Sequence, residues 1–258
     1  MKLRVLLGVR ALAFGFVLCF GAVASAGTVG GPAPDFSLSV SSSTGDALLI
    51  PSPSLTPNGD GSFSGTASGA PLTFSFSSNF TVNDDPFISG SFSLVNLSPS
   101  TQLFTVGATL NGVSLGGPVK FHGSFGAATF TDQSADNAVT FASPTLASPG
   151  SLPFMTARID GSQVAIIGAF EDALTSQGGS PLVGTHPREA FGEPVLLDWP
   201  GITNTMAVSF AFSLTPGDKV EVPFEFIVVP EPSGLATFAI VSALFLCAFA
   251  QKRASKLD

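Results

Sequence analysis

The sequence predicts an all-β protein: a single antiparallel β-sandwich, jelly-roll-like, between an N-terminal signal helix and a C-terminal transmembrane helix. Three observations lead to this prediction. Hydrophobic residues alternate with polar ones at a period of two along most of the chain. Glycine and proline recur throughout and interrupt any long helical register. Apolar runs flanked by basic residues stand at both ends, outside the alternating region.

The first 26 residues have the layout of a secretory signal peptide. Three basic residues precede an apolar run and a small-residue cleavage site: Lys2, Arg4 and Arg10, then residues 11–23, then Ala24 and Ala26. We therefore expect cleavage after Ala26, which leaves residues 27–229 as one domain outside the cytoplasm. Single all-β domains routinely reach that length.

Short alternating segments predict the strands of this domain. They include the following positions: Phe36, Leu38 and Val40; Phe74 and Phe76; Ile88, Phe92 and Leu94; Val106, Ala108 and Leu110. The dipeptides Asn111-Gly112 and Asp160-Gly161 predict two-residue hairpin turns, because they tolerate the positive φ of a type I′ turn. Residues 41–54 and 144–153 read as loops.

Two longer segments near the end of the domain predict a hairpin. Residues 206–214 and 219–228 both alternate, and Thr-Pro-Gly-Asp at 215–218 reads as the turn between them. Phe210 and Phe224 should be buried, while Glu221 and Glu225 stay exposed. Pro223 lacks an N–H donor, which favours an edge position for its strand.

The domain is acidic and contains no cysteine. Residues 27–229 hold four Lys or Arg against sixteen Asp or Glu, a formal charge of −12. That charge repels phosphate backbones, so nucleic acid is not an expected partner. Cys19 and Cys247 lie in the two apolar end segments, which removes thiol catalysis and cysteine-ligated metals from the domain.

Residues 230–258 have a motif, an apolar run and a basic tail. The motif is Pro230, Glu231 and Pro232, the predicted membrane helix is residues 235–250, and the tail contains Lys252, Arg253 and Lys256. The sixteen apolar residues span about 24 Å against a bilayer core of about 30 Å, which suits a provisional anchor. The positive-inside rule makes the basic tail a cytoplasmic stop signal.

This arrangement resembles the PEP-CTERM sorting signal of Gram-negative bacteria. The resemblance covers about thirty residues firmly. It implies recognition by an exosortase, a membrane transpeptidase that cuts near the motif and releases the protein or transfers it to the surface. It also implies an association with exopolysaccharide and biofilm matrix. The expected location is therefore the membrane first, and then the cell surface or the extracellular space.

Candidate chemistry in the outer domain is sparse. Gly112-Val113-Ser114-Leu115-Gly116 matches the nucleophile-elbow pattern, but the following Gly-Gly-Pro prevents the helix which that motif needs. His122 and His186 stand far apart without ligand spacing and read as exposed surface residues. No nucleophile, base and orienting group can be assembled, so we expect no enzymatic activity and no catalytic residues.

Two binding hypotheses remain. A loose calcium hypothesis uses oxygen ligands from two loops, namely Asn58, Asp60, Asp84 and Asp85, whereas a cluster of turn-forming residues explains the same sequence. A sugar contact would have to use Trp199, the only tryptophan in a chain without tyrosine. The sequence thus predicts a surface or matrix protein of structural or interaction type. The alternative is a polysaccharide-binding module, with or without calcium and with no other cofactor.

Overall fold

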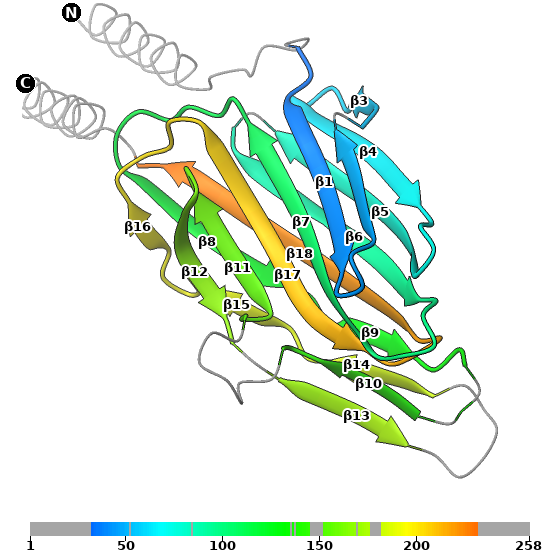
Figure 1. The fold of residues 1–258 in the computed structure, drawn as a ribbon. Helices are drawn as coiled ribbons and strands as arrows, with labels where there is room; N and C mark the ends of the chain where they lie inside the picture. Colours follow the sequence, from blue (N-terminus) through cyan, green and yellow to red (C-terminus); the bar gives the residue numbers. More distant parts are fainter. Residues whose placement is uncertain are drawn as a thin grey trace, which may run out of the picture.

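A computed structural model describes residues 32–51, 53–83, 85–134, 136, 138–144, 152–168, 170–175 and 182–231. This part of the chain forms two packed antiparallel β-sheets and contains no helix, as Figure 1 shows. The all-β sandwich predicted from the sequence is therefore confirmed. The predicted signal helix and transmembrane helix lie outside these residues. Within them, no helix has the length and apolar character needed to span a membrane.

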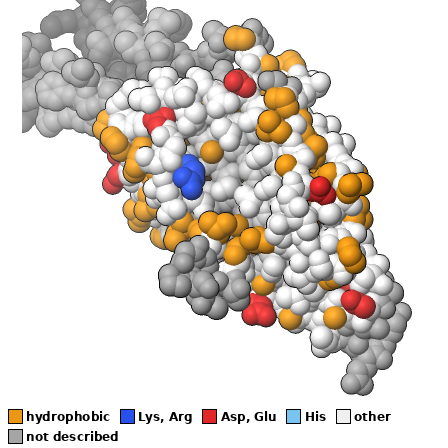
Figure 2. All heavy atoms as spheres, in the orientation of Figure 1, with side chains coloured by type: hydrophobic (Ala, Val, Ile, Leu, Met, Phe, Trp, Pro, Cys, Tyr) orange, Lys and Arg blue, Asp and Glu red, His pale blue; other side chains and the backbone are white. Residues whose placement is uncertain are grey.

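The first sheet, sheet A, has eight strands. Its main path runs through β12 (Ser162–Ile167), β11 (Met155–Ile159), β17 (Thr205–Leu214), β7 (Gln102–Asn111), β1 (Asp35–Ser42) and β2 (Ala47–Pro51). Of the remaining two strands, β10 (Ala138–Ala142) pairs with the end of β17, and β13 (Glu171–Thr175) pairs with β10. Charged side chains on the outer face of this sheet are sparse and stand apart among polar and scattered hydrophobic ones (Figure 2).

The second sheet, sheet B, has ten strands. Its main path runs through β14 (Val183–His186), β9 (Ala128–Thr131), β18 (Lys219–Pro230), β6 (Phe87–Asn96), β5 (Phe74–Asn83), β4 (Ser62–Gly69) and β3 (Leu55–Pro57). β8 (Val119–Phe125) also pairs with β18, and the last two strands, β15 (Glu189–Phe191) and β16 (Leu197–Trp199), pair with β8. β18 is thus an interior strand with neighbours on both sides.

Phenylalanine fills the space between the sheets. The largest fully buried side chains are all phenylalanines. Phe92 of sheet B contacts Phe210 and Phe212 of sheet A with ring centroids 5.3 and 6.0 Å apart. A phenyl ring has no hydroxyl that needs a partner, so a core of this kind can be continuous and dry. The predicted burial of Phe210 and Phe224 is confirmed.

The outward positions of β18 follow the prediction closely. Glu221 is exposed and Glu225 is half-buried, while the alternate residues of the strand are buried.

The predicted hairpin between residues 206–214 and 219–228 is wrong. β17 belongs to sheet A and β18 to sheet B, so the turn at 215–218 carries the chain from one layer to the other. Both strands have one apolar face, and the sandwich buries those faces against each other. Asn96 holds this crossing, because its side-chain amide donates to the carbonyl oxygens of Leu214 at 2.8 Å and Thr215 at 3.1 Å.

Pro223 does not mark an edge strand. It lies on interior strand β18, opposite the break where β8 ends and β9 has not begun. The carbonyl of Pro223 accepts a hydrogen bond from the N–H of Gly126 at 2.8 Å across this break. The donor that proline lacks would point to the same side, where the ladder is interrupted, so little is lost.

The two predicted hairpin turns have different outcomes. Asp160-Gly161 joins β11 and β12 with φ values of 50° and 77°, as a type I′ turn requires. Gly112 also has a positive φ of 71°, but the next strand after Asn111 lies in the other sheet, so no hairpin forms there. The expected loop at residues 41–54 contains strand β2, which pairs with β1.

Candidate functional site

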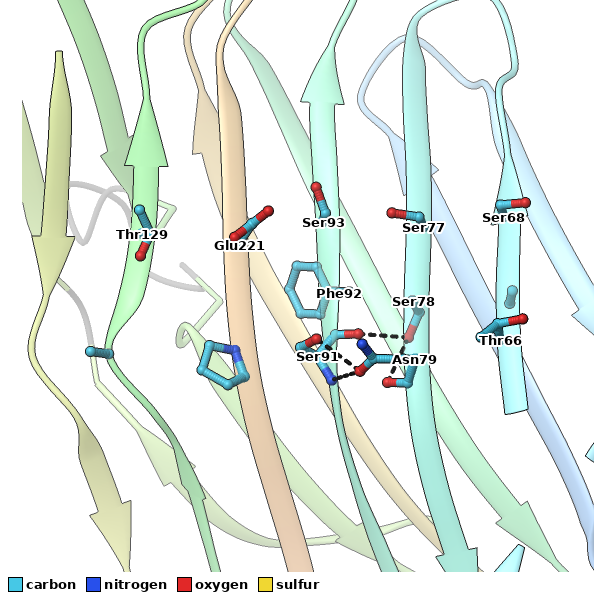
Figure 3. A pocket seen from close by; sticks show the side chains of 13 residues that line it. Thr66, Ser68, Ser77, Ser78, Asn79, Ser91, Phe92, Ser93, Thr129 and Glu221 are labelled. Carbon is cyan, nitrogen blue, oxygen red and sulfur yellow. Dashed lines mark hydrogen bonds between the residues drawn. The ribbon is translucent and has the colours of Figure 1, made fainter. Parts of the chain in front are cut away.

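The outer face of sheet B is hollowed into a groove, formed by three adjoining cavities of about 700, 550 and 400 Å³. Thr66 and Asn79 line both the first and the second cavity. Ser68, Ser77 and Ser93 line both the first and the third. The three hollows therefore adjoin one another across β4, β5 and β6. Figure 3 shows the first of them. We call them together the hydroxyl groove.

Strand register arranges the groove side chains into two rows. The first row consists of consecutive cross-strand partners from β4 to β9: Ser68, Ser77, Ser93, Glu221 and Thr129. The second row, two residues further along the strands, consists of Thr66, Asn79, Ser91 and Pro223. Neighbouring strands are about 4.8 Å apart, so each row offers a side chain at that interval. Figure 3 shows the first row crossing the sheet.

The alternation of the sequence produces these rows. On β5, Phe74, Phe76 and Phe80 point into the core, which leaves Ser77 and Asn79 on the outer face. β6 does the same with Phe92 inside and Ser91 and Ser93 outside. Serine and threonine side chains are short and project little from the sheet, which is consistent with a hollow at this place.

The two rows differ in their internal hydrogen bonds. In the second row, the Asn79 Oδ1 atom accepts from the backbone N–H of Ser91 at 3.2 Å and from its hydroxyl at 2.9 Å. In the first row, the hydroxyls of Ser68, Ser77, Ser93 and Thr129 make no side-chain hydrogen bond within the described residues. These hydroxyls remain able to donate to, and accept from, a ligand.

The hydroxyl groove is almost free of charge. Glu221 is the one ionisable residue among those that line the three described hollows. Its Oε1 atom lies 2.5 Å from the Nζ atom of Lys219, so its charge is neutralised locally. An uncharged surface of this kind suits a neutral polar ligand.

The predicted calcium ligands occupy two turns. Asp60 accepts hydrogen bonds from the hydroxyl of Ser62 at 2.6 Å and from its backbone N–H at 2.9 Å, and these bonds lower the pKa of Asp60. Asn58 donates to the hydroxyls of Ser62 and Ser64. Asp85 is exposed, and Asp84 lies outside the described residues. Asn58 also lines the second hollow of the groove.

Trp199 does not line the groove. It lies on β16 opposite Val119, is half-buried, and packs against the hydrophobic core. Its neighbour Asp198 accepts a hydrogen bond from Lys120 at 2.6 Å. A role for Trp199 in binding sugar stays a prediction.

The predicted sorting motif begins where the sandwich ends. Pro230 is the last residue of β18 and is exposed. The carboxylate of Glu231 lies 3.0 Å from the Nζ atom of Lys120, and its N–H donates to the carbonyl of Pro118. The other residues singled out at the two ends lie outside the described part: Ala24, Ala26, Pro232, Lys252, Arg253 and Lys256.

The expectation that both histidines are exposed is wrong. His186 is buried at the end of β14, with Nδ1 2.5 Å from Asp172 Oδ2 and Nε2 3.1 Å from Glu189 Oε1. Its ring stacks on Phe170 at a centroid distance of 3.8 Å. Sequence spacing could not show this, because Asp172 and Glu189 come from different strands. His122 is half-buried on β8.

Comparisons with known proteins add little. No protein-family model matches the chain. No curated protein matches it either. Among solved structures, the chain is similar to a galactose mutarotase related enzyme from Lactobacillus acidophilus, with 12% identity over 70% of this chain and 72% of that one. The TM-score is 0.24, which does not establish a shared fold.

Proposed function

We propose that this chain is a non-enzymatic surface protein, sorted by an exosortase, whose hydroxyl groove binds a neutral polysaccharide. The observation that carries this proposal is the first row of the groove, whose serine and threonine hydroxyls have no hydrogen-bond partner among the described residues. A protein surface normally leaves such groups to water. A row of them in a continuous hollow favours a ligand that is itself rich in hydroxyls.

The chemistry of the row matches a sugar polymer. Each serine or threonine hydroxyl both donates and accepts, as each sugar hydroxyl does, so the two can exchange hydrogen bonds in several arrangements. The four strand intervals from Ser68 to Thr129 extend over about 19 Å, which favours an extended chain over a single sugar. The lack of Lys and Arg in the groove disfavours acidic polymers.

The groove also sets the strength of binding. A neutral hydrogen bond contributes only about 0.5–1.5 kcal/mol, and no exposed aromatic ring of the described groove offers a stacking platform. We therefore expect weak binding of monosaccharides and useful affinity only for polymers that engage the row repeatedly.

Delivery to the surface is the second part of the proposal. Pro230 ends β18, so a peptidase acting near the motif would cut beside the sandwich without disturbing the core. Replacing Pro230, Glu231 and Pro232 with alanine should leave membrane insertion intact and stop processing. Mass spectrometry of the mature C-terminus tests this. Recovery of residues 251–258 from the mature surface protein would contradict processing and would mean that the C-terminal segment is an ordinary membrane anchor.

Affinity electrophoresis tests the groove. The full chain, in mild detergent, is run through gels that contain a neutral or an acidic polysaccharide. Retardation by the neutral polymer is expected for the wild type. A Ser77→Glu/Ser93→Glu variant should lose it, because two carboxylates would then fill the centre of the first row.

The matched control is Ser41→Glu, which places a carboxylate on an exposed position of the outer face of sheet A. It should retain the retardation. Equal retardation of the wild type and the double variant, each relative to a gel without polysaccharide, would contradict binding in the groove and would favour a purely structural role.

A further inference from the structure

Three side chains from separate segments of the chain lie close together beside β8 and β18 of sheet B. His122 comes from β8, Glu225 from β18, and Glu193 from the segment between β15 and β16. One ligand atom of each lies within 4.8 Å of the other two, and no other such group occurs within the described residues. Glu225 is two residues along β18 from Pro223, so the group shares a face with the hydroxyl groove.

His122 has an unsatisfied atom in this group. Its Nδ1 atom is buried and has no hydrogen-bond partner among the described residues. The nearest carboxylate oxygen, Glu193 Oε1, is 3.9 Å away, beyond hydrogen-bond range. A buried polar atom without a partner is destabilising, so its presence calls for an explanation.

The two carboxylates are held in place by their neighbours. Ser124 donates its hydroxyl to Glu225 Oε1 at 2.9 Å. Arg188 lies beside both carboxylates: it donates two hydrogen bonds to Glu193, from Nη1 to Oε2 at 2.8 Å and from Nη2 to Oε1 at 2.5 Å, and its Nη2 atom is 3.7 Å from Glu225 Oε1.

Gly192 brings the third ligand to the strand. Its φ is +72°, and a Cβ atom there would lie 2.7 Å from the carbonyl oxygen of Phe121 and 3.0 Å from the Cβ of His122. Only a residue without a side chain allows this approach. The backbone therefore lies directly against β8 and places Glu193 beside His122.

We propose that His122, Glu193 and Glu225 form a binding site for a divalent transition metal of the zinc type. One imidazole nitrogen and two carboxylate oxygens are ligands that zinc accepts, and three protein ligands leave a fourth position for water. A nitrogen ligand disfavours calcium and magnesium, which prefer oxygen. A bound metal ion would be the partner that the Nδ1 atom of His122 lacks among the described residues.

Arg188 limits the affinity of this site. Two carboxylates and one guanidinium leave a net charge of −1 when His122 is neutral. Metal binding takes Glu193 Oε1 away from Nη2, while the bond from Nη1 to Oε2 can remain. We therefore expect moderate affinity for the metal. The inference does not depend on the proposed polysaccharide binding.

Zinc titration tests the proposal. The full chain in mild detergent is treated with EDTA, dialysed and titrated with zinc in a calorimeter, and cobalt gives a parallel visible spectrum. One zinc per chain is expected. His122→Ala and Glu193→Gln should each weaken binding about tenfold or more, since they remove a ligand directly.

Asp198→Asn is the matched control, because Asp198 is also a carboxylate in an ion pair, with Lys120, two residues before His122 on β8. It should bind zinc like the wild type. Glu193 is exposed, so its variant remains informative if His122→Ala fails to fold. No binding by the wild type, or equal binding by the wild type and Glu193→Gln, would overturn the site.

Discussion

The two ends of β17 are each joined to a neighbouring turn by an aspartate, and the two carboxylates have opposite surroundings. Asp160 accepts three backbone N–H groups at the start of the strand, from Thr203, Asn204 and Thr205 at 2.8, 2.8 and 2.9 Å. Asp218 lies after the end of the strand and is fully buried. Its Oδ1 atom has no hydrogen-bond partner in the part of the chain that the structure describes.

The pKa values of the two groups shift in opposite directions. Burial acts to raise the pKa of Asp160, but the backbone N–H groups outweigh it and the pKa is lowered. Burial raises the pKa of Asp218 to about 6, against the hydrogen bond from the Thr215 hydroxyl. Three backbone N–H groups outweigh burial at Asp160, whereas at Asp218 the hydrogen bonds from the Thr215 hydroxyl and the Gln133 backbone do not outweigh it.

The largest expected effect is at Asp160. Asp160→Ala should lower the free energy of unfolding by about 3 kcal/mol, because three hydrogen bonds are lost and alanine is strained at a φ of 50°. Urea unfolding measures the loss. Asp160→Asn keeps an acceptor and tolerates this φ, so it should lose less. A loss under about 1 kcal/mol in the alanine variant would mean that these bonds contribute little.

The next effect is at Asp218 and has the opposite sign. Its folded pKa of about 6 exceeds the ordinary aspartate pKa of 3.8, so the folded state holds more protons between these values. The contribution of Asp218 to stability is then complete below about pH 4 and is lost as the pH rises to about 6. Asp218→Asn should therefore raise the free energy of unfolding at pH 8 by about 1–2 kcal/mol.

Urea unfolding at pH 5 and pH 8 checks this prediction. The gain in Asp218→Asn should shrink at the lower pH. Asp160→Asn is the control, because the pKa of Asp160 is lowered and its stabilisation is lost only as the pH falls through that lowered value. An Asp218→Asn variant less stable than the wild type at pH 8 would show that the ionised carboxylate is favourable here.

Local sequence predicted one end of β17 and not the other. Asp160-Gly161 is a two-residue turn whose positive φ values follow from the residues themselves. The segment at 215–218 has equally good turn residues, yet it joins two sheets. Alternation shows which face of a strand is apolar, but not which strand lies beside it. The same limit explains why Pro223 suggested an edge.

The groove was beyond sequence reasoning for a related reason. Alternation placed serine on the outer face of β5 and β6, which the structure bears out. The rows exist only because β4, β5, β6, β18 and β9 pair in one register. Local motifs led to Asn58, Asp60 and Trp199, whereas a better signal is small hydroxyl residues at alternate positions of neighbouring strands.

The smallest expected effect is the difference in unfolding free energy between two glycine substitutions, one in each of the same two turns. Gly161 and Gly217 have φ values of +77° and +73°, so alanine is strained equally at both. A Cβ atom at Gly161 meets nothing within 4 Å, whereas at Gly217 it would lie 2.7 Å from the Cβ of Ser134. Gly161→Ala should cost about 1–2 kcal/mol for the left-handed backbone alone.

Gly217→Ala should cost about 1 kcal/mol more than Gly161→Ala, because the loop that contains Ser134 has to move away from the turn. Parallel urea titrations of the two variants give this difference directly, since the backbone term cancels. A Gly217→Ala/Ser134→Gly double variant should recover most of the extra loss by removing the side chain that the new methyl group meets. Equal losses in the two single variants would mean that the loop moves freely, and the burial of Asp218 beneath this turn would then be less rigid than its full enclosure indicates.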